Sequence, residues 1–412
     1  MRHVHALFLS ASQGLEAMFP GFLEELRVAG AVVSDFGNAY GMFQYGAWKP
    51  RFKAGFDVIA CSRPLIEWHL RLHVEALPNV KILYEYTAED LTASADRQRV
   101  TGVRIKGCTG EEPLAAELVL DAAGRGTRAP RWLDALGYGR PEEQAVGIDL
   151  AYVTQIFERP VDTQRDWDGL VVTARAPGRR GAFVLPIEGA RWLVSMTGLF
   201  GDHCPTDADG FLEFARSLPV LDVYQVIKGA TPLSKPAMHK IPSSRWLHYE
   251  KMKRLPAGLL MLGDSVCALN PVYGQGITVA IQCVRELEAA LKNLSLGTGD
   301  LRDLTPSMQQ RLAKVIRPSW MLSTTMDLRY PEATGKRAPG IFAVQWLFAA
   351  FTDMTTVNEK ACRLLFDIMH MRRRPEALLQ FDLLLPFIGY CARSPFVPLA
   401  KRIRQGPIPR AT

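Results

Sequence analysis

Hydrophobic and polar positions follow helix and strand periods along most of the first 145 residues. Residues 12–30 are amphipathic at helical spacing, with a break expected at Pro20-Gly21 and an end at Gly30. Pro64 stands in the favoured first turn of another helix, LIEWHLRLHVEAL. Strand-like runs occupy 31–35, 42–48, 56–61, 80–86, 100–105 and 118–121. This alternation predicts an α/β domain.

The pattern changes between residues 146 and 249. The runs IDLAYVTQIF, LVVTA, GAFVLPIEG and RWLVSMTGLF alternate like strands, with a helix expected near 207–218, and predict an antiparallel sheet of a second domain. Residues 258–262 are continuously apolar, which is typical of a buried parallel strand returning to the first domain. After Gln275 the chain is mostly helical. We therefore expect a discontinuous first domain (1–145 and 250–300), a second domain (146–249) and a helical region (301–412).

Composition supports a globular enzyme. The chain has 412 residues, 48% of them hydrophobic and 22% charged, enough for two packed domains. Its 7 cysteines show no Cys-x-x-Cys and no spacing of a metal site, which suits a reducing cytoplasm. The start is not a signal peptide. Apolar runs such as 341–351 are shorter than the roughly 18 residues of a membrane-spanning helix.

The positive charge is concentrated at the end of the chain. Residues 371–412 hold eight Lys or Arg against two acids, although the whole chain has a net charge of +7. The rest of the chain, residues 1–370, is therefore almost neutral, which argues against a nucleic-acid partner. The run FDLLLPFIGYCA (381–392) lies between two basic groups, an arrangement typical of a helix that lies on an anionic membrane surface. The alternative is a helix that buries its apolar face in the core. The basic groups are Arg372, Arg373 and Arg374, then Lys401, Arg402 and Arg404.

The string GLLMLGDSVCALNPVYGQGITVAIQCVRELEAAL (258–291) carries the strongest chemical signal. Asp264, at the end of a strand, can accept hydrogen bonds from a sugar or ribityl hydroxyl. Gly274 and Gly276 let backbone N–H groups approach a ligand closely. The helix that begins there offers a partial positive charge to an anion, such as the N1–C2=O edge of a reduced flavin. The alternative is that the glycines only make the turn.

Several stretches resemble class A flavoprotein monooxygenases of the para-hydroxybenzoate hydroxylase type. The 258–291 string is similar to their Gly-Asp flavin motif, and LVLDAAGRGTRAPRWLDAL (118–136) resembles their Asp-Gly-x-x-Ser-x-x-Arg fingerprint. Ala123 replaces the fingerprint's Asp, as in the branch of polyether-type alkene epoxidases, which leaves the pyrophosphate or nicotinamide contact open. The matching residues are Gly263, Asp264, Ser265, Pro271, Gly274, Gln275 and Gly276, then Gly124, Thr127 and Arg131, with Arg128 as an extra cation.

Two smaller stretches agree with this resemblance. SRPLIEWHL (62–70) is similar to a segment whose arginine, Arg63 here, contacts the cofactor in the family, and LPIEGARWLVSM (185–196) resembles a substrate-domain hairpin with Glu188-Gly189 as its turn. The resemblance implies a Rossmann-like FAD-binding domain, an antiparallel-sheet substrate domain and a helical C-terminal region. The implied cofactor contacts are Arg63, Gly124, Arg128, Gly263, Asp264, Pro271, Gly274, Gln275 and Gly276.

Family members begin with a strand, a Gly-x-Gly-x-x-Gly loop and a helix. This sequence contains no such unit and opens at residues 2–7, a segment that follows the unit in relatives. The resemblance therefore leads us to expect the unit upstream of the given start, or lost from a degraded relative. His3 and His5 then have two interpretations, as side chains that line the flavin or substrate, or as part of a frayed terminus.

The implied function is FAD-dependent oxygenation. NAD(P)H would reduce FAD, O₂ would add at C4a, and the hydroperoxide would hydroxylate or epoxidise a hydrophobic small molecule. The acceptor could be an activated aromatic ring or an alkene, and the epoxidase-like strings favour an alkene of polyketide or terpenoid type. No catalytic acid or base can be assigned. Reduction of isoprenoid double bonds and a non-catalytic remnant of the fold are the alternatives.

Overall fold

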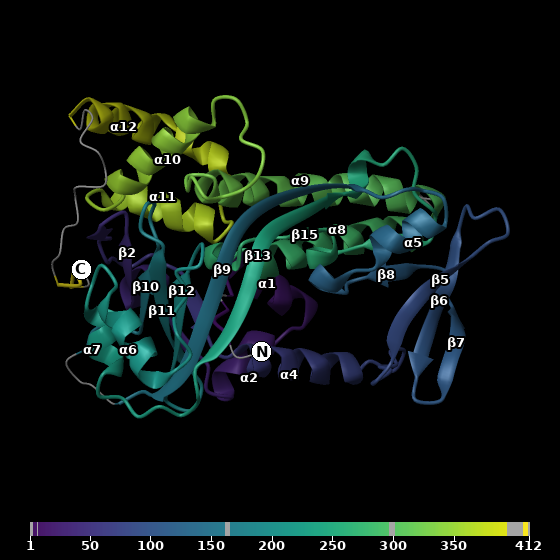
Figure 1. Cartoon of the computed structure of the whole chain (residues 1–412), viewed down its shortest axis with the longest axis horizontal. Coiled ribbons are helices and arrows are strands. Elements are labelled where there is room, and N and C mark those ends of the chain that lie inside the picture. Colours follow the sequence, from purple (N-terminus) through teal and green to yellow (C-terminus); the bar gives the residue numbers. More distant parts are fainter. Residues whose placement is uncertain (1–2, 6, 161–164, 296–300, 394–406, 411–412) are drawn as a thin grey trace. The chain divides into compact units, whose positions relative to one another are not determined.

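The computed structural model describes residues 3–5, 7–160, 165–295, 301–393 and 407–410. The chain forms two compact units (Figure 1). Unit 1 contains residues 1–71, 147–243 and 325–412, and unit 2 contains residues 72–146 and 244–324. The chain passes from one unit to the other within α4 (Arg63–Glu75), β9 (Glu142–Glu158), β13 (Ala237–His248) and α9 (Leu301–Asp327).

Unit 1 is built on a mainly antiparallel sheet of order β13-β9-β12-β11-β10-β2-β3. The other strands of this sheet are β2 (Tyr40–Gln44), β3 (Ala47–Trp48), β10 (Gly169–Val172), β11 (Arg180–Ile187) and β12 (Arg191–Gly198). The remaining elements of unit 1 are α1 (Leu9–Met18), α2 (Phe22–Val28), β1 (Val32–Asp35), α3 (Phe36–Ala39), β4 (Asp57–Ala60), α4 (Arg63–Glu75, which ends in unit 2), α6 (Ala208–Arg216), α7 (Asp222–Ile227), α10 (Ile341–Met354), α11 (Glu359–Met369), η5 (Pro375–Leu379) and α12 (Phe381–Arg393).

The core of unit 1 lies between the sheet and helices α6 and α7. Alternate strand residues such as Val153, Leu170 and Trp192 pack against Phe211 and Val223 of these helices, as the two-residue period of a half-buried sheet requires. Asp207 caps α6 by accepting a hydrogen bond from the Gly210 N–H at 2.7 Å. Figure 1 shows both helices beside the part of the sheet that contains β10, β11 and β12.

The described part of unit 2 contains two smaller sheets and several helices. β5 (Thr87–Ala93), β6 (Val100–Gly107) and β7 (Gly110–Ala115) form an antiparallel sheet, and β8 (Val119–Asp121) pairs in parallel with β14 (Leu259–Met261). β15 (Cys267–Ala268) pairs with Arg245 and Trp246. The remaining elements are η1 (Gly124–Gly126), α5 (Ala129–Ala135), η2 (Tyr249–Lys251), η3 (Gly263–Ser265), η4 (Pro271–Tyr273) and α8 (Gly276–Ser295), together with most of α9.

Most of the predicted elements are confirmed. The helix break falls at Pro20-Gly21, where Gly21 has a left-handed φ of 90°, and residues 258–262 contain the expected parallel strand. β11 and β12 form the predicted hairpin, with Ile187 paired to Arg191 across the Glu188-Gly189 turn. The described residues after Gln275 are mostly helical.

Two strand predictions need correction. Residues 80–86 are not a strand: Glu85 has a left-handed φ of 63°, and the alternating apolar side chains there face solvent instead of a core. Residues 42–48 are extended as expected, but they turn back at Tyr45-Gly46. β2 pairs in parallel with β10, so this segment belongs to the large sheet of unit 1 rather than to an α/β domain.

The division of the chain by contacts differs from the predicted domains. The predicted boundaries near 146 and 249 fall close to the observed limits of the central segment, residues 147–243. Residues 1–71 and 325–412, however, group with that segment in unit 1. The assignment of cofactor and substrate roles to residue ranges stays a prediction.

A buried histidine makes the stability of unit 1 depend on pH. His370 is fully buried, and its ring lies 4.7 Å from Phe8, 4.3 Å from Phe36 and 4.7 Å from Phe56. Its Nδ1 accepts a hydrogen bond from the Leu9 N–H at 3.2 Å. Burial lowers the pKa of His370 from 6.5 to about 3. The folded protein therefore keeps this imidazole neutral where the unfolded chain binds a proton.

We predict that stability falls as pH drops from 6.5 toward 3. The unfolded state binds a proton in that range that the folded state does not, which lowers the free energy of unfolding by up to about 1.4 kcal/mol per pH unit. His370→Asn keeps an acceptor near Nδ1 but cannot titrate, so its unfolding free energy in urea should vary less with pH. His73→Asn on α4 controls for the loss of a histidine. An unchanged pH slope for His370→Asn would contradict this account.

Candidate functional site

The loops that carry the two sequence fingerprints leave the same edge of a pair of parallel strands in unit 2. Leu259, Leu260 and Met261 of β14 pair with Val119, Leu120 and Asp121 of β8. The two strands therefore end side by side, and the loops that follow them begin at the same level. The carboxyl edge of parallel strands is where α/β folds bind ligands.

Asp121 holds the first loop in place. The carboxylate is buried, and its Oδ1 accepts hydrogen bonds from the Ala123 N–H at 2.9 Å and the Ser265 hydroxyl at 3.2 Å. Its Oδ2 accepts one from the Thr127 hydroxyl. The Asp121 carbonyl also accepts a hydrogen bond from the Leu262 N–H at 2.9 Å. One acid thus organises its own loop and joins it to the loop after β14.

Ser265 completes the link between the two loops. Its hydroxyl donates to Asp121 and accepts a hydrogen bond from the Gly124 N–H at 2.9 Å. Gly124 has a left-handed φ of 70°, and a Cβ at this position would lie 3.8 Å from the Cβ of Asp264. The backbone of the first loop therefore passes directly beside Asp264, which is exposed.

Arg125 forms a second bridge between the loops. Its Nη2 donates to the Leu269 carbonyl at 2.9 Å, and the Arg125 carbonyl accepts a hydrogen bond from Arg245 Nη2 at the same distance. Burial lowers the pKa of Arg125, and the nearby charge of Asp264 opposes that shift. The guanidinium remains cationic, so an exposed carboxylate and a half-buried cation stand together where the loops meet.

The second loop prepares the start of α8. The Asn270 side chain caps η4 by accepting a hydrogen bond from the Val272 N–H at 3.1 Å, and Gly274 ends that turn with a left-handed φ of 69°. A Cβ at Gly276 would meet no protein atom within 4 Å. The first N–H groups of α8 have no acceptor within the helix. The helix N-terminus therefore combines open space with backbone donors and a favourable dipole.

These features fit a flavin nucleotide. An exposed carboxylate suits hydroxyl donors of a ribityl chain, and a helix start that lacks a side chain suits the close approach of an anionic ring edge or phosphate. Gln275 is buried, and its Oε1 has no hydrogen-bond partner among the described residues. The exposed Pro271 fixes the turn that leads to it. Gly124, Gly263, Asp264, Pro271, Gly274, Gln275 and Gly276 thus lie on two joined loops.

Arg128 and Arg63 make ion pairs of their own. Arg128 makes an ion pair with Glu89 at 2.7 Å and donates to the Ala88 carbonyl at 3.2 Å, so its guanidinium is turned to β5. Arg63 belongs to unit 1, where it pairs with Glu67 at 2.5 Å. Their contact with a cofactor stays a prediction.

The two N-terminal histidines lie in unit 1. His3 Nδ1 is 2.9 Å from Thr154 Oγ1, and His5 Nε2 is 3.2 Å from Arg63 Nη1. Burial lowers the pKa of His3 to about 4. Both side chains are therefore held by defined contacts, and a role beside a flavin or substrate stays a hypothesis.

Sequence reasoning missed three residues that build the site. It placed the acid of the fingerprint at Ala123, whereas the structure uses Asp121 two positions earlier to hold the loop. Arg125 and the structural role of Ser265 were not anticipated either. Asp121 could have been found as an acid at the end of a buried strand, but a contact of Arg125 with the Leu269 carbonyl, 144 residues away, leaves no local signal.

We predict that Ser265→Ala destabilises unit 2. The substitution leaves the half-buried Gly124 N–H without its acceptor and removes a hydrogen bond to the buried Asp121, a loss of about 1–3 kcal/mol in the free energy of unfolding. Urea denaturation monitored by circular dichroism measures it. Ser307→Ala, on the exposed side of α9, should change stability by less than about 0.5 kcal/mol. Equal effects of the two substitutions would show that the link between the loops contributes little.

Comparison with known proteins shows which family the chain belongs to. No model of a known protein family matches the chain. Protein Rv3254 of Mycobacterium tuberculosis is 32% identical over 376 residues, which cover 85% of this chain and 77% of that protein. This degree of similarity places the two proteins in one family.

Solved structures identify the fold. PqsL of Pseudomonas aeruginosa, a probable FAD-dependent monooxygenase, matches with a TM-score of 0.60 at 16% identity, covering 84% of this chain and 89% of PqsL. The p-nitrophenol 4-monooxygenase PnpA of Pseudomonas putida matches with a TM-score of 0.62 at 15% identity, covering 90% and 89%. The flavin-dependent brominase Bmp2 matches with a TM-score of 0.56 at 12% identity, covering 95% and 85%. The chain therefore belongs to the family of Protein Rv3254, and it has the fold of class A flavoprotein monooxygenases.

Proposed function

We propose that this protein binds FAD and uses it, with NAD(P)H and O₂, to oxygenate a hydrophobic small molecule. The observation that carries the proposal is the junction of the two fingerprint loops at the ends of β8 and β14. There Asp264 is exposed beside the backbone of Gly124, and the N-terminus of α8 is open at Gly276.

In this proposal each part of the junction has a separate task in binding. Asp264 accepts hydrogen bonds from ribityl hydroxyls of the cofactor. The backbone N–H groups at Gly274, Gln275 and Gly276 face the electron-rich edge of the ring, where the dipole of α8 favours negative charge. Arg125 balances the charge of Asp264 and keeps the two loops in register.

FAD, when bound and reduced, supplies the electrons with which O₂ is activated for transfer of one oxygen atom to the substrate. The protein's part is then to hold the cofactor and exclude water. This division of labour needs no catalytic triad or metal. It also explains why the candidate site is made mainly of backbone groups and loop-fixing side chains.

The proposed acceptor is hydrophobic, and we favour an alkene over an activated aromatic ring. The support comes from the sequence strings DAAGRGTR and RWLVSM, which resemble those of the alkene epoxidase branch. PnpA is named for an aromatic substrate, and Bmp2 for bromination, so the shared fold itself accommodates more than one reaction.

The two alternative functions predict different consumption of NAD(P)H and O₂, or different binding of flavin. A reductase of isoprenoid double bonds would consume reductant without O₂, whereas the proposed monooxygenase consumes both in equal amounts when its substrate is present. A non-catalytic relative would bind no flavin. Oxygen uptake and the absorbance of NAD(P)H, measured together with candidate alkenes, separate the three.

We predict that Gly276→Val abolishes FAD binding and leaves the fold intact. The valine side chain meets no protein atom close to its Cβ, so it costs little in the protein itself, but it fills the space through which the cofactor approaches the start of α8. Quenching of flavin fluorescence on titration with the protein measures the affinity. We expect a loss of at least about a hundredfold, which corresponds to about 2.7 kcal/mol.

The matched control is Gly229→Val. Gly229 also has open space around its Cβ, but it follows α7 in unit 1, far along the chain from either fingerprint. Its FAD affinity should equal that of the unaltered protein. If Gly276→Val binds FAD as tightly as the control, the loop before α8 is not the flavin site.

A further inference from the structure

Helix α10 in unit 1 buries polar side chains and exposes large apolar ones. Seven of its residues are buried, and three of them, Gln345, Thr352 and Asp353, are polar. The Gln345 Nε2 donates to the Thr325 carbonyl at 2.8 Å inside the protein. A helix that faced water would show the opposite distribution.

The outward face of α10 carries large apolar side chains. Phe342 is 73% exposed and Trp346 is 50% exposed, and these two residues lie one turn apart. Val344 and Leu347 are exposed beside them. Adjacent large apolar side chains on a surface indicate a contact with another apolar phase.

Helix α12, which contacts α10, exposes further apolar side chains. It packs with α10 around Phe351, whose ring lies 6.2 Å from that of Phe387. Leu385 and Ile388 of α12, three residues apart, are both exposed. Figure 1 shows α10, α11 and α12 grouped together at the C-terminal end of unit 1. We call the exposed residues Phe342, Val344, Trp346, Leu347, Leu385 and Ile388 the apolar surface.

Cations stand next to the helices of the apolar surface in the sequence. Lys336 and Arg337 are exposed a few residues before α10, and Arg372, Arg373 and Arg374 are exposed between α11 and η5. Arg372 is paired with Asp367 at 2.8 Å, whereas Arg373 reaches Asp367 only at 3.9 Å. Lys401, Arg402 and Arg404, which were predicted to add to this charge, lie outside the described residues.

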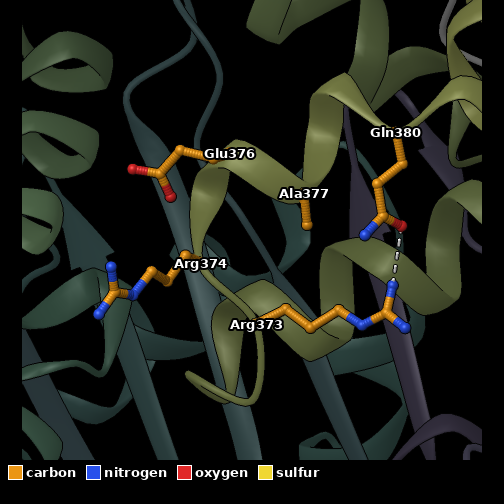
Figure 2. Close-up of a pocket in the computed structure, with 5 residues that line it drawn as sticks. All are labelled: Arg373, Arg374, Glu376, Ala377 and Gln380. Carbon is orange, nitrogen blue, oxygen red and sulfur yellow. Dashed lines mark hydrogen bonds between the residues drawn. The ribbon is translucent and has the colours of Figure 1, made fainter.

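A hollow of about 450 Å³ lies just before α12, lined by Arg373, Arg374, Glu376, Ala377 and Gln380. Figure 2 shows the side chain of Arg373 directed to Gln380, where Nη1 donates to Oε1 at 3.0 Å, and the side chain of Arg374 directed to the opposite side. Two guanidinium groups against one carboxylate leave the hollow positive. Such a hollow suits a phosphate group that also carries an amine, because Glu376 can accept from the amine.

We propose that α10 and α12 form an in-plane membrane-docking surface for anionic phospholipid. The apolar surface enters the boundary between head groups and acyl chains, and the neighbouring cations attract the negative lipid. The hollow takes the phosphate of one head group. The helices lie on the membrane and do not cross it: among the described helices none is both long and apolar enough to span a bilayer.

Charge favours a lipid surface over a second copy of this chain. A two-fold dimer through this face would bring together two copies that both carry the exposed cations Lys336, Arg337, Arg373 and Arg374 beside these helices in the sequence. Anionic lipid instead neutralises every one of these cations. This inference does not depend on the proposed oxygenation, since neither FAD nor a substrate enters the argument.

Sedimentation with vesicles tests the proposal on the full chain. We use phosphatidylcholine vesicles with and without about one third phosphatidylserine, at low salt. The unaltered protein should pellet with the anionic vesicles. Trp346→Gln should weaken this partitioning about tenfold, because it removes apolar surface that would enter the membrane. Arg373→Gln with Arg374→Gln should weaken it about tenfold on anionic vesicles and much less on neutral ones.

Trp68→Gln is the matched control, since Trp68 is 59% exposed on α4, outside the apolar surface. It should bind vesicles like the unaltered protein, and circular dichroism confirms that each variant is folded. No pelleting of the unaltered protein, or equal partitioning of Trp346→Gln and Trp68→Gln, would overturn the proposal. Sedimentation velocity that shows a dimer, converted to monomer by Trp346→Gln, would overturn it as well and identify a second copy as the partner.

Discussion

The pairing of β8 with β14, fixed by the carboxylate of Asp121, is the constraint on which the candidate site depends. Residues 121 and 261 are partners in the register, although they are 140 positions apart in the sequence. Asp121 then uses both carboxylate oxygens and its carbonyl to hold Ala123, Thr127, Ser265 and Leu262. A buried acid that satisfies several donors at once is costly to replace, because each donor would lose its acceptor.

Asp264 and the start of α8 are useful only because this constraint exists. The carboxylate of Asp264 stands beside Gly124 because Ser265, the next residue, is tied to the Gly124 N–H. Arg125 then reaches the Leu269 carbonyl and shares its electrostatic environment with Asp264. The elements that would meet a cofactor are thus backbone groups and one exposed acid, and the residues that position them are buried behind.

Much of this arrangement could be predicted from local sequence, and the remainder could not. The continuous apolar run at 258–262 and the glycines after it identify a strand, a turn and a helix by their intrinsic preferences. The two wrong strand predictions arose because pairing with distant segments, and not the local pattern, determines the structure there. Residues 42–48 look like any other strand, yet a partner at 169–172 draws them into the large sheet of unit 1. Residues 80–86 alternate correctly but pair with no strand in the described part of the chain, and the antiparallel pairing of β5 begins only at Thr87.

For helix α10, the hydrophobic pattern predicts burial of side chains that the structure exposes. Its sequence, IFAVQWLFAAFTDM, is apolar nearly all round and indicates a buried helix. The structure instead buries Gln345 and exposes Trp346, a choice that only the packing partners of the helix determine. The amino-acid composition of the helix therefore cannot predict which side chains face the core and which face solvent.

The central claim is that the loops after β8 and β14 together receive FAD. Amide hydrogen exchange of the full chain, compared with and without saturating FAD, tests it most directly. The account predicts slower exchange in the backbone of residues 122–128 and 263–278, with both loops protected together because Asp121 and Ser265 join them. Protection confined to other segments, or protection of one loop without the other, would contradict the account.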